Sequence, residues 1–132
     1  MKLVVDTSVI LAVLLNEPHR QMILDITKGA ELYAPASLHW EIGNAFSAMF
    51  KQKRLTLDQA HAGLATYRHI PIRLEDVELA KAVDLAATSS IYAYDAYMLV
   101  CARKIGAPLI SLDQKLLRTA RECGIIVMEV SL

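Results

Sequence analysis

Short apolar runs rich in β-branched residues alternate along the chain with longer segments in which apolar residues recur every three or four positions. The first pattern is typical of buried strands and the second of amphipathic helices. Five strands are predicted from the short runs, over residues 2–5, 31–34, 70–74, 108–111 and 125–130.

Helices are predicted between these strands from periodicity and from capping signals. They cover residues 8–15, 18–29, 37–54, 56–69, 76–88, 95–105 and 113–123. We expect Ser37 to cap the third helix, and Thr56 with Gln59 has capping-box spacing for the fourth. The helix over 76–88 is expected to carry on one side Val77, Ala80, Val83 and Ala87. The helix over 95–105 is apolar almost all round, so we expect it to be buried.

Strands that alternate with helices indicate βα units and a parallel sheet covered on both faces. We therefore predict a three-layer α/β/α fold with a central, mostly parallel sheet. The length of 132 residues corresponds to a single domain over 1–132. Apolar residues make up 55% of the chain, which is enough for a full core and indicates a further buried surface, such as a subunit interface.

Composition limits the possible partners and compartments. Lys and Arg number 14, as do Asp and Glu, so the zero net charge excludes a basic coat for nucleic acid. Cys101 and Cys123 are too few for a disulfide framework. The longest strictly apolar run covers only residues 9–15, whereas a membrane span needs roughly 20 residues. We expect a reduced, soluble, cytoplasmic protein without a membrane partner.

Four acidic residues are predicted to lie where strands lead into helices, at Asp6, Glu41, Asp95 and Asp113. In a parallel sheet these junctions share one edge, which is where binding sites form. Each acid also has a local explanation, since Asp and Glu are favoured as helix caps and in first turns. Asp95 fits that explanation least well, because its helix has little polar surface and no Lys or Arg stands beside it.

Together the four acids predict a cation site. Converging carboxylates repel one another unless they are protonated or neutralised by a metal. Oxygen ligands without His or Cys favour Mg²⁺ or Mn²⁺ over zinc. One ion or a pair of ions would activate water and stabilise charge on a phosphodiester. Ser8, Asn44 and Ser111 are placed to hydrogen-bond the ligands.

The order and spacing of four motifs resemble those of PIN-domain ribonucleases, and most of all the VapC toxins of type II toxin–antitoxin systems. The motifs are Asp6-Thr7-Ser8, Glu41-Ile42-Gly43-Asn44, Tyr94-Asp95-Ala96 and Ser111-Leu112-Asp113. Each motif alone is weak, but the ordered set is specific, and the resemblance covers essentially the whole chain.

The resemblance implies that the catalytic and metal-binding residues are Asp6, Glu41, Asp95 and Asp113. It implies that the polar residues lining the site are Ser8, Asn44 and Ser111. It also implies RNA cleavage with Mg²⁺ or Mn²⁺, a homodimer, and inhibition by a VapB-like antitoxin. Some relatives carry a further acid just beyond the position of Asp113, where this chain has Gln114, Lys115 and Leu116, so the number of metal ions stays open.

Two further residues are candidates for contact with RNA. Lys115 is close enough to Asp113 to reach a phosphate, although it also fits a solvated helix face. Tyr94 stands beside Asp95 and can stack on an unpaired base, although such rings more often pack in a core or an interface.

Two other classes of function are alternatives to a metal-dependent ribonuclease. Phosphoryl transfer on an aspartate, as in haloacid dehalogenases, needs a second Asp where this chain has Ser8, and a receiver domain needs a Lys after a late strand, where this chain has Asp113. A PIN-like module could also bind RNA or protein without cutting it. Without the four clustered acids, ten acids remain against fourteen bases, so a metal-loaded protein would be mildly basic and suited to RNA.

Overall fold

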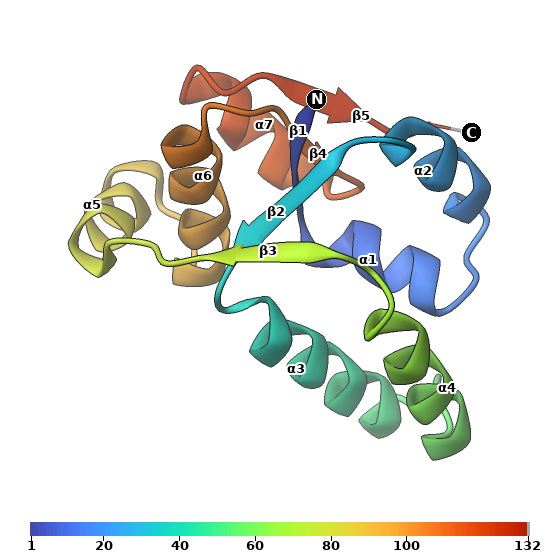
Figure 1. Ribbon diagram of the computed structural model, residues 1–132. Helices are drawn as coiled ribbons and strands as arrows, with labels where there is room; N and C mark the ends of the chain where they lie inside the picture. The colour runs from blue at the N-terminus through green and yellow to red at the C-terminus, as the bar shows by residue number, and fades with distance from the viewer. Residues whose placement is uncertain (132) are drawn as a thin grey trace.

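The computed structural model describes residues 1–131, in which five strands alternate with seven helices (Figure 1). The elements in chain order are β1 (Lys2–Val5), α1 (Thr7–Leu14), α2 (Arg20–Thr27), β2 (Glu31–Pro35), α3 (Leu38–Lys51), α4 (Leu57–Tyr67), β3 (Ile72–Glu75), α5 (Leu79–Ser89), α6 (Ala93–Ile105), β4 (Leu109–Ser111), α7 (Gln114–Glu122) and β5 (Val127–Glu129). Every predicted strand and helix is present, with ends that shift by a few residues.

The five strands form one parallel sheet in the order β3-β2-β1-β4-β5. The central strand β1 pairs on one side with β2, where Leu3 is opposite Leu32, and on the other with β4, where Val5 is opposite Ile110. The chain therefore winds outward from β1 in both directions. The strand order reverses beside β1, and this reversal is the usual position for a site in an open α/β sheet.

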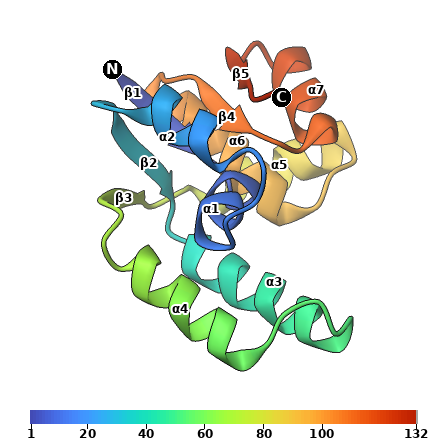
Figure 2. The ribbon, with the colours of Figure 1, turned by 90° about the vertical axis from the view of Figure 1, so that its right-hand side faces the viewer.

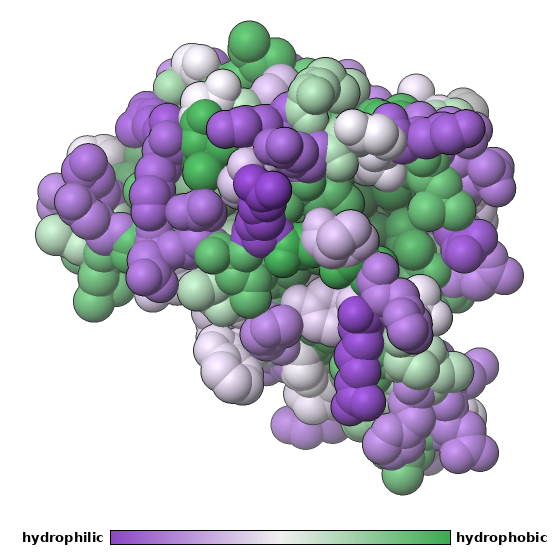
Figure 3. Space-filling view, viewed as in Figure 1, coloured by the Kyte–Doolittle hydropathy of each residue, from purple (hydrophilic) through white to green (hydrophobic). Residues whose placement is uncertain are grey.

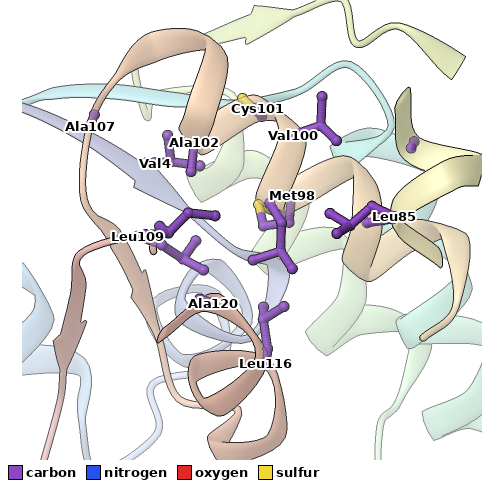
Figure 4. Close-up of a cluster of buried hydrophobic side chains, with 14 of the residues drawn as sticks. Val4, Leu85, Met98, Val100, Cys101, Ala102, Ala107, Leu109, Leu116 and Ala120 are labelled. Atoms are coloured by element: carbon purple, nitrogen blue, oxygen red, sulfur yellow. The ribbon is translucent and has the colours of Figure 1, made fainter. Parts of the chain in front are cut away.

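Helices cover both faces of the sheet, which confirms the three-layer architecture (Figure 2). Neighbouring strand residues point to opposite faces, so Val4 packs with α5, α6 and α7 while Val5 packs with α1 to α4. Figure 4 shows the first of these cores, in which Met98 of α6 and Leu116 of α7 lie close to Leu109 of β4. Both cores rest on the same three inner strands.

The α6 helix is buried along most of its length, as predicted. Six of its thirteen residues are buried, namely Ala96, Met98, Leu99, Val100, Cys101 and Ala102. The buried helix holds its first turn, and Asp95 with it, firmly against the sheet. None of the helices within residues 1–131 combines the length and the apolar character needed to cross a bilayer.

Of the four residues predicted to share one side of the helix over 76–88, only Val77 packs against the core, and it precedes α5. The helix buries Ala82 and Leu85 against α6, whereas Val83 is 53% exposed. Ala80 and Ala87 also face solvent. Because α5 has apolar residues on both sides, its periodicity alone does not identify the side that packs.

The α3 helix differs from its prediction at both ends. The helix ends at Lys51 and not at residue 54 as predicted, because Lys53 adopts a left-handed conformation with φ 57°. At the other end Ser37 occupies the cap position, but its hydroxyl makes no hydrogen bond to the helix backbone. That hydroxyl bonds a side chain of the candidate site instead.

Candidate functional site

The four predicted acids all lie at the carboxyl edge of the sheet. Asp6 follows β1 directly, Glu41 is in the first turn of α3 after β2, and Asp113 caps α7 after β4. The prediction that Asp95 lies where a strand leads into a helix was wrong, because Asp95 is in the first turn of α6 and the preceding element is the helix α5. Because β2, β1 and β4 are adjacent strands, these junctions are neighbours in space although they are far apart in sequence.

Asp6 is the most buried of the four, with 4% of its surface exposed. Its Oδ1 accepts hydrogen bonds from the Ser8 hydroxyl at 2.6 Å and from the Val9 N–H at 3.2 Å. Its Oδ2 accepts one from the Ser111 hydroxyl at 2.6 Å. Asp6 therefore caps α1, as expected for an Asp directly before a helix. It also faces the candidate site.

Burial is the main cause that raises the pKa of Asp6 to about 6. The three hydrogen bonds oppose this rise because they stabilise the charged carboxylate, and the charge of Asp113 adds to it. The hydrogen bonds thus hold the carboxylate in one position, but they do not fully offset the free-energy cost of burying its charge.

Two hydroxyls link Asp6 to the loop between β4 and α7. The Ser8 hydroxyl donates to Asp6 and accepts from the Leu112 N–H at 3.0 Å. The Ser111 hydroxyl donates to Asp6 and accepts from the Asp113 N–H at 2.9 Å. The backbone on which Asp113 stands is therefore fixed relative to Asp6.

Glu41 is held by two hydroxyls that the sequence prediction missed. Its Oε1 accepts a hydrogen bond from Thr7 at 3.1 Å, and its Oε2 accepts one from Ser37 at 2.7 Å. Burial raises the pKa of Glu41, the two hydroxyls lower it, and the charges of Asp6 and Asp95 raise it again. Ser37 stands four residues before Glu41, a local spacing that could have been noticed. The approach of Thr7 depends on the pairing of β1 with β2.

Asp95 and Asp113 are less constrained. The Asp95 carboxylate accepts no hydrogen bond from a residue in 1–131, and its pKa is raised by partial burial and by the charge of Asp113. Lys115 lowers that pKa, so its ammonium lies within electrostatic reach of Asp95. Asp113 accepts hydrogen bonds at Oδ1 from the N–H groups of Lys115 and Leu116, which leaves Oδ2 free to meet a ligand.

Mutual repulsion connects the four carboxylates in a closed ring. The charge of Asp113 raises the pKa of both Asp6 and Asp95. The charges of Asp6 and Asp95 in turn raise the pKa of Glu41. Within residues 1–131 none of the four forms a salt bridge with Lys, Arg or His. The site is therefore a concentration of negative charge with no protein cation paired to it.

The donor set suits a hard divalent cation, although it is not a closed cage. Across the described residues no three Asp, Glu, His or Cys side chains are close enough together to form a ready-made metal site. Mg²⁺ does not need such a cage, since it usually keeps several waters and takes one or two carboxylates. Asp95 and Asp113 have carboxylate oxygens without hydrogen bonds within residues 1–131, and these could bind such a partly hydrated ion.

Two other predicted residues lie outside the hydrogen-bond network. Asn44 is exposed on α3, and no hydrogen bond within residues 1–131 joins its side chain to the four acids. Tyr94 is 45% exposed and meets Tyr97 edge to face, with ring centroids 5.9 Å apart. The hydroxyls that support the acids are thus Thr7, Ser8, Ser37 and Ser111.

A comparison of the sequence with known protein families identifies the family of this chain. The sequence model described as PIN domain matches residues 3–122, which include all four acids. The chain belongs to the PIN domain family. PIN domains are in general nucleases. A comparison with curated proteins finds no match.

Solved structures share this PIN fold at low sequence identity. PAE2754 from Pyrobaculum aerophilum is 20% identical with a TM-score of 0.71, over 96% of this chain and 83% of that one. VapBC2 from Rickettsia felis, bound to a DNA fragment from their promoter, is 15% identical with a TM-score of 0.70, over 99% and 100%. FitAcB from Neisseria gonorrhoeae is 17% identical with a TM-score of 0.64, over 96% of each chain.

Proposed function

We propose that this PIN domain is a metal-dependent endoribonuclease that hydrolyses RNA phosphodiester bonds. The observation that carries the proposal is the ring of four carboxylates at the carboxyl edge of the sheet, none of which forms a salt bridge with a cation within residues 1–131. A site of this charge repels a phosphodiester by itself, so it suits RNA only together with divalent cations.

The four carboxylates Asp6, Glu41, Asp95 and Asp113 would hold Mg²⁺ or Mn²⁺. Asp95 and Asp113 have the most free acceptor capacity, while Asp6 and Glu41 are fixed by hydroxyls. A bound ion supplies activated water and neutralises charge on the phosphate. The chain itself supplies rigid positions for its carboxylates, through the bonds of Ser8, Ser111, Thr7 and Ser37.

Lys115 and Tyr94 are the proposed contacts to RNA outside the acids. Lys115 is exposed and acts electrostatically on Asp95, so its ammonium can reach a phosphate next to the one cleaved. Tyr94 precedes Asp95 and exposes nearly half its surface, which leaves room to stack on an unpaired base. The stacking contact of Tyr94 favours single-stranded RNA, whose bases are accessible.

The test is cleavage of a labelled single-stranded RNA by the purified protein with Mg²⁺, with Mn²⁺, and with EDTA. We expect Asp95→Asn to abolish metal-dependent cleavage without loss of the fold, since Asp95 is partly exposed and its side chain makes no hydrogen bond to another residue in 1–131. Asp84→Asn is the matched control, because Asp84 is exposed on α5 outside the ring.

Cleavage that survives EDTA, or that Asp95→Asn leaves intact, would contradict the metal-dependent mechanism. Binding of RNA without cleavage by the wild-type protein would instead favour a non-catalytic binding module. Metal titration by calorimetry separates the two outcomes, because the enzyme requires metal binding and the binding module does not.

We further propose that the protein is the toxin of a toxin–antitoxin pair, acting in the cytoplasm as a homodimer. The support is the PIN fold shared with VapBC2 and FitAcB and the two free cysteines, Cys101 and Cys123. A VapB-like antitoxin would cover the acidic site. Growth arrest on expression, relieved by the product of a small neighbouring reading frame, tests this role, and expression without any effect on growth would contradict it.

A further inference from the structure

Three cationic side chains gather at the turn between α3 and α4. Lys51 ends α3, Lys53 and Arg54 stand in the turn, and all three are exposed. We call these three residues the basic turn. Within residues 1–131 none of the three forms a salt bridge, and the Arg54 guanidinium bonds only the Gln52 Oε1, at 3.0 Å. Mostly hydrophilic side chains cover the visible side of the α3–α4 hairpin, at the lower right of Figure 3.

The backbone at Lys53 is strained in a way that a smaller residue would avoid. The Arg54 N–H donates to the Met49 carbonyl at 2.9 Å and the Lys53 N–H to the Phe50 carbonyl at 3.0 Å, which is the pattern of a helix end that usually places glycine where Lys53 stands. A long cationic side chain is therefore kept where glycine would be more stable. Backbone outliers of this kind cluster at functional positions. The other described residues with φ in this region are all small, namely Asn16, Gly29, Ser90, Gly106 and Gly124.

The α3 helix connects the basic turn to the ring of carboxylates. Glu41 is in its first turn and Lys51 at its end, ten positions and thus about 15 Å further along the axis. Asn44 and Ala48 share the side of the helix that carries these two residues, and both are exposed. On this side α3 therefore places neither a bulky nor an acidic side chain between the ring and the basic turn. In Figure 2 the helix runs from the middle of the molecule to the turn at the lower right.

We propose that the basic turn binds phosphates of the same RNA strand that is cut at the ring of carboxylates, several nucleotides away from the cleaved bond. This inference rests on the proposed ribonuclease function and names the form of RNA that the site takes. In a stacked strand, which rises about 3.4 Å per nucleotide, the distance of about 15 Å corresponds to about four to five nucleotides. Lys115 acts on Asp95 from α7, so cations on two different elements would hold the strand on either side of the cut. The substrate is then an RNA with a single-stranded extension beside the cleaved bond.

The salt dependence of RNA binding tests this contact. For single strands, the logarithm of the affinity falls with the logarithm of the salt concentration by about 0.7 for each phosphate contact. The variant Lys51→Gln/Lys53→Gln/Arg54→Gln should therefore have a slope that is shallower by about 2. The measurement is fluorescence anisotropy of a labelled single-stranded RNA at constant Mg²⁺ and increasing KCl. Every protein carries Asp95→Asn, so that the RNA stays uncut.

The matched control is Lys2→Gln/Lys28→Gln/Lys81→Gln, which removes the same charge from three other exposed lysines. Lys2 begins β1 and Lys28 precedes β2, so both stand at the amino edge of the sheet, and Lys81 is on α5. The slope of this control should stay close to that of the protein with Asp95→Asn alone. The comparison separates a contact at the basic turn from a general attraction between the protein and RNA.

Lys53→Gly distinguishes a role in binding from a role in the fold. Glycine adopts the left-handed conformation freely, so this variant should melt a few degrees higher than its parent protein. It should nevertheless bind the RNA about fivefold more weakly at 0.1 M salt, which is the loss of one phosphate contact. A residue with a merely structural role would change the melting temperature and leave the affinity for RNA unchanged.

The length of the RNA gives a third test, in which cleavage is measured. RNAs with one cleavage site are extended stepwise on the 5′ or the 3′ side. With the wild-type chain, kcat/KM should rise when the extension on one side reaches about four to five nucleotides. The glutamine variant of the basic turn, here with Asp95 intact, should cleave the short RNAs as the wild type does and show no such rise.

Three results each overturn the inference. They are a slope that the glutamine variant leaves unchanged, a slope that the lysine control reduces just as much, and a Lys53→Gly variant that binds RNA as tightly as its parent. Binding that follows the expected slopes while the wild type cuts no RNA would contradict the ribonuclease proposal and not the contact at the basic turn. The two proposals therefore fail by different measurements.

Discussion

At the scale of single residues, the site depends on hydroxyl groups as much as on carboxylates. Ser8 and Ser111 hold Asp6, and Thr7 and Ser37 hold Glu41. Each hydroxyl donates to a carboxylate and so favours its charged form against the effect of burial. The acids can thus remain both buried and ionised near neutral pH.

The raised pKa values predict an unusual dependence of stability on pH. The pKa of Asp6 rises from 3.8 to about 6 on folding, so the native state binds a proton before the unfolded state does. In the absence of metal, stability should therefore increase as the pH falls from about 6 to about 4, by up to about 3 kcal/mol from Asp6 alone. Glu41 and Asp95 act in the same direction. Urea unfolding in EDTA at several pH values measures this effect.

Asp6→Asn is the control for this prediction, because it removes the titrating group while it keeps the shape of the side chain. The gain in stability on acidification should shrink in this variant. A wild-type protein that loses stability steadily over the same pH interval would show that Asp6 has no raised pKa.

The hydroxyls of Thr7 and Ser37 are expected to set the acidic limit of activity. Thr7→Val or Ser37→Ala removes a donor to Glu41, so the pKa of Glu41 should rise further. The acidic limb of the pH–rate profile for RNA cleavage should move to higher pH, while the alkaline plateau changes little. Ser47→Ala is the control, since the Ser47 hydroxyl on the same helix bonds, within residues 1–131, only the Asn44 carbonyl. An unshifted limb would contradict the role of these hydroxyls.

Asp6, Glu41 and Asp113 were predictable as a group because their position after strands is a local property, whereas Asp95 follows the helix α5. The hydroxyls were only partly predictable, because serine and threonine occur throughout the chain and their partners depend on strand order. Asn44 illustrates the opposite error. It stands three residues after Glu41, which suggested a shared face, yet its side chain remains exposed.

At the scale of elements, strands and helices were predictable wherever one local signal dominated. The capping box of Thr56 and Gln59 forms as predicted and begins α4. The packed side of α5 was not predictable, because Leu79 and Val83 are apolar but exposed, while small Ala82 is fully buried. Tertiary contacts with α6 decide which side is covered, and sequence periodicity does not contain them.

The contact of α4 with its neighbours predicts an opposite response to small and large substitutions at Gly63. A Cβ at Gly63 would meet Phe46 at 3.5 Å and Leu14 at 3.6 Å, which are ordinary van der Waals distances. Gly63→Ala should therefore stabilise the protein by about 0.5–1 kcal/mol through helix propensity. Gly63→Leu should destabilise it by about 1–3 kcal/mol through overpacking. Thermal unfolding measures both, and a destabilising Gly63→Ala would mean that α4 packs more tightly.

At the scale of the whole molecule, one sheet carries two cores. Val4 and Leu109 face α5 to α7, while Val5 and Ile110 face α1 to α4. The α/β/α architecture was predictable because alternating strands and helices leave few other arrangements. The open edge at β3 was not, because strand order is not encoded in any single segment.

The shared sheet predicts that damage to one core unfolds both. Leu99 is fully buried on α6, so Leu99→Ala should cost about 2–5 kcal/mol. Trp40, the one tryptophan, is on α3 at the opposite side of the sheet. Its fluorescence should therefore follow the same lowered transition as far-ultraviolet circular dichroism. Separate transitions for the two probes would mean that the cores unfold independently.

The hydrogen bond between Ser111 and Asp6 joins residues 105 positions apart in the sequence. During synthesis from the N-terminus, Asp6 and Glu41 are made long before Asp95, Ser111 and Asp113. β1 remains without its β4 neighbour until that last part of the chain is available. An incomplete nascent chain therefore lacks half of the acidic ring and the bonds that orient the rest. If the protein cleaves RNA as proposed, the order of synthesis would keep the unfinished chain from cutting the RNA from which it is translated.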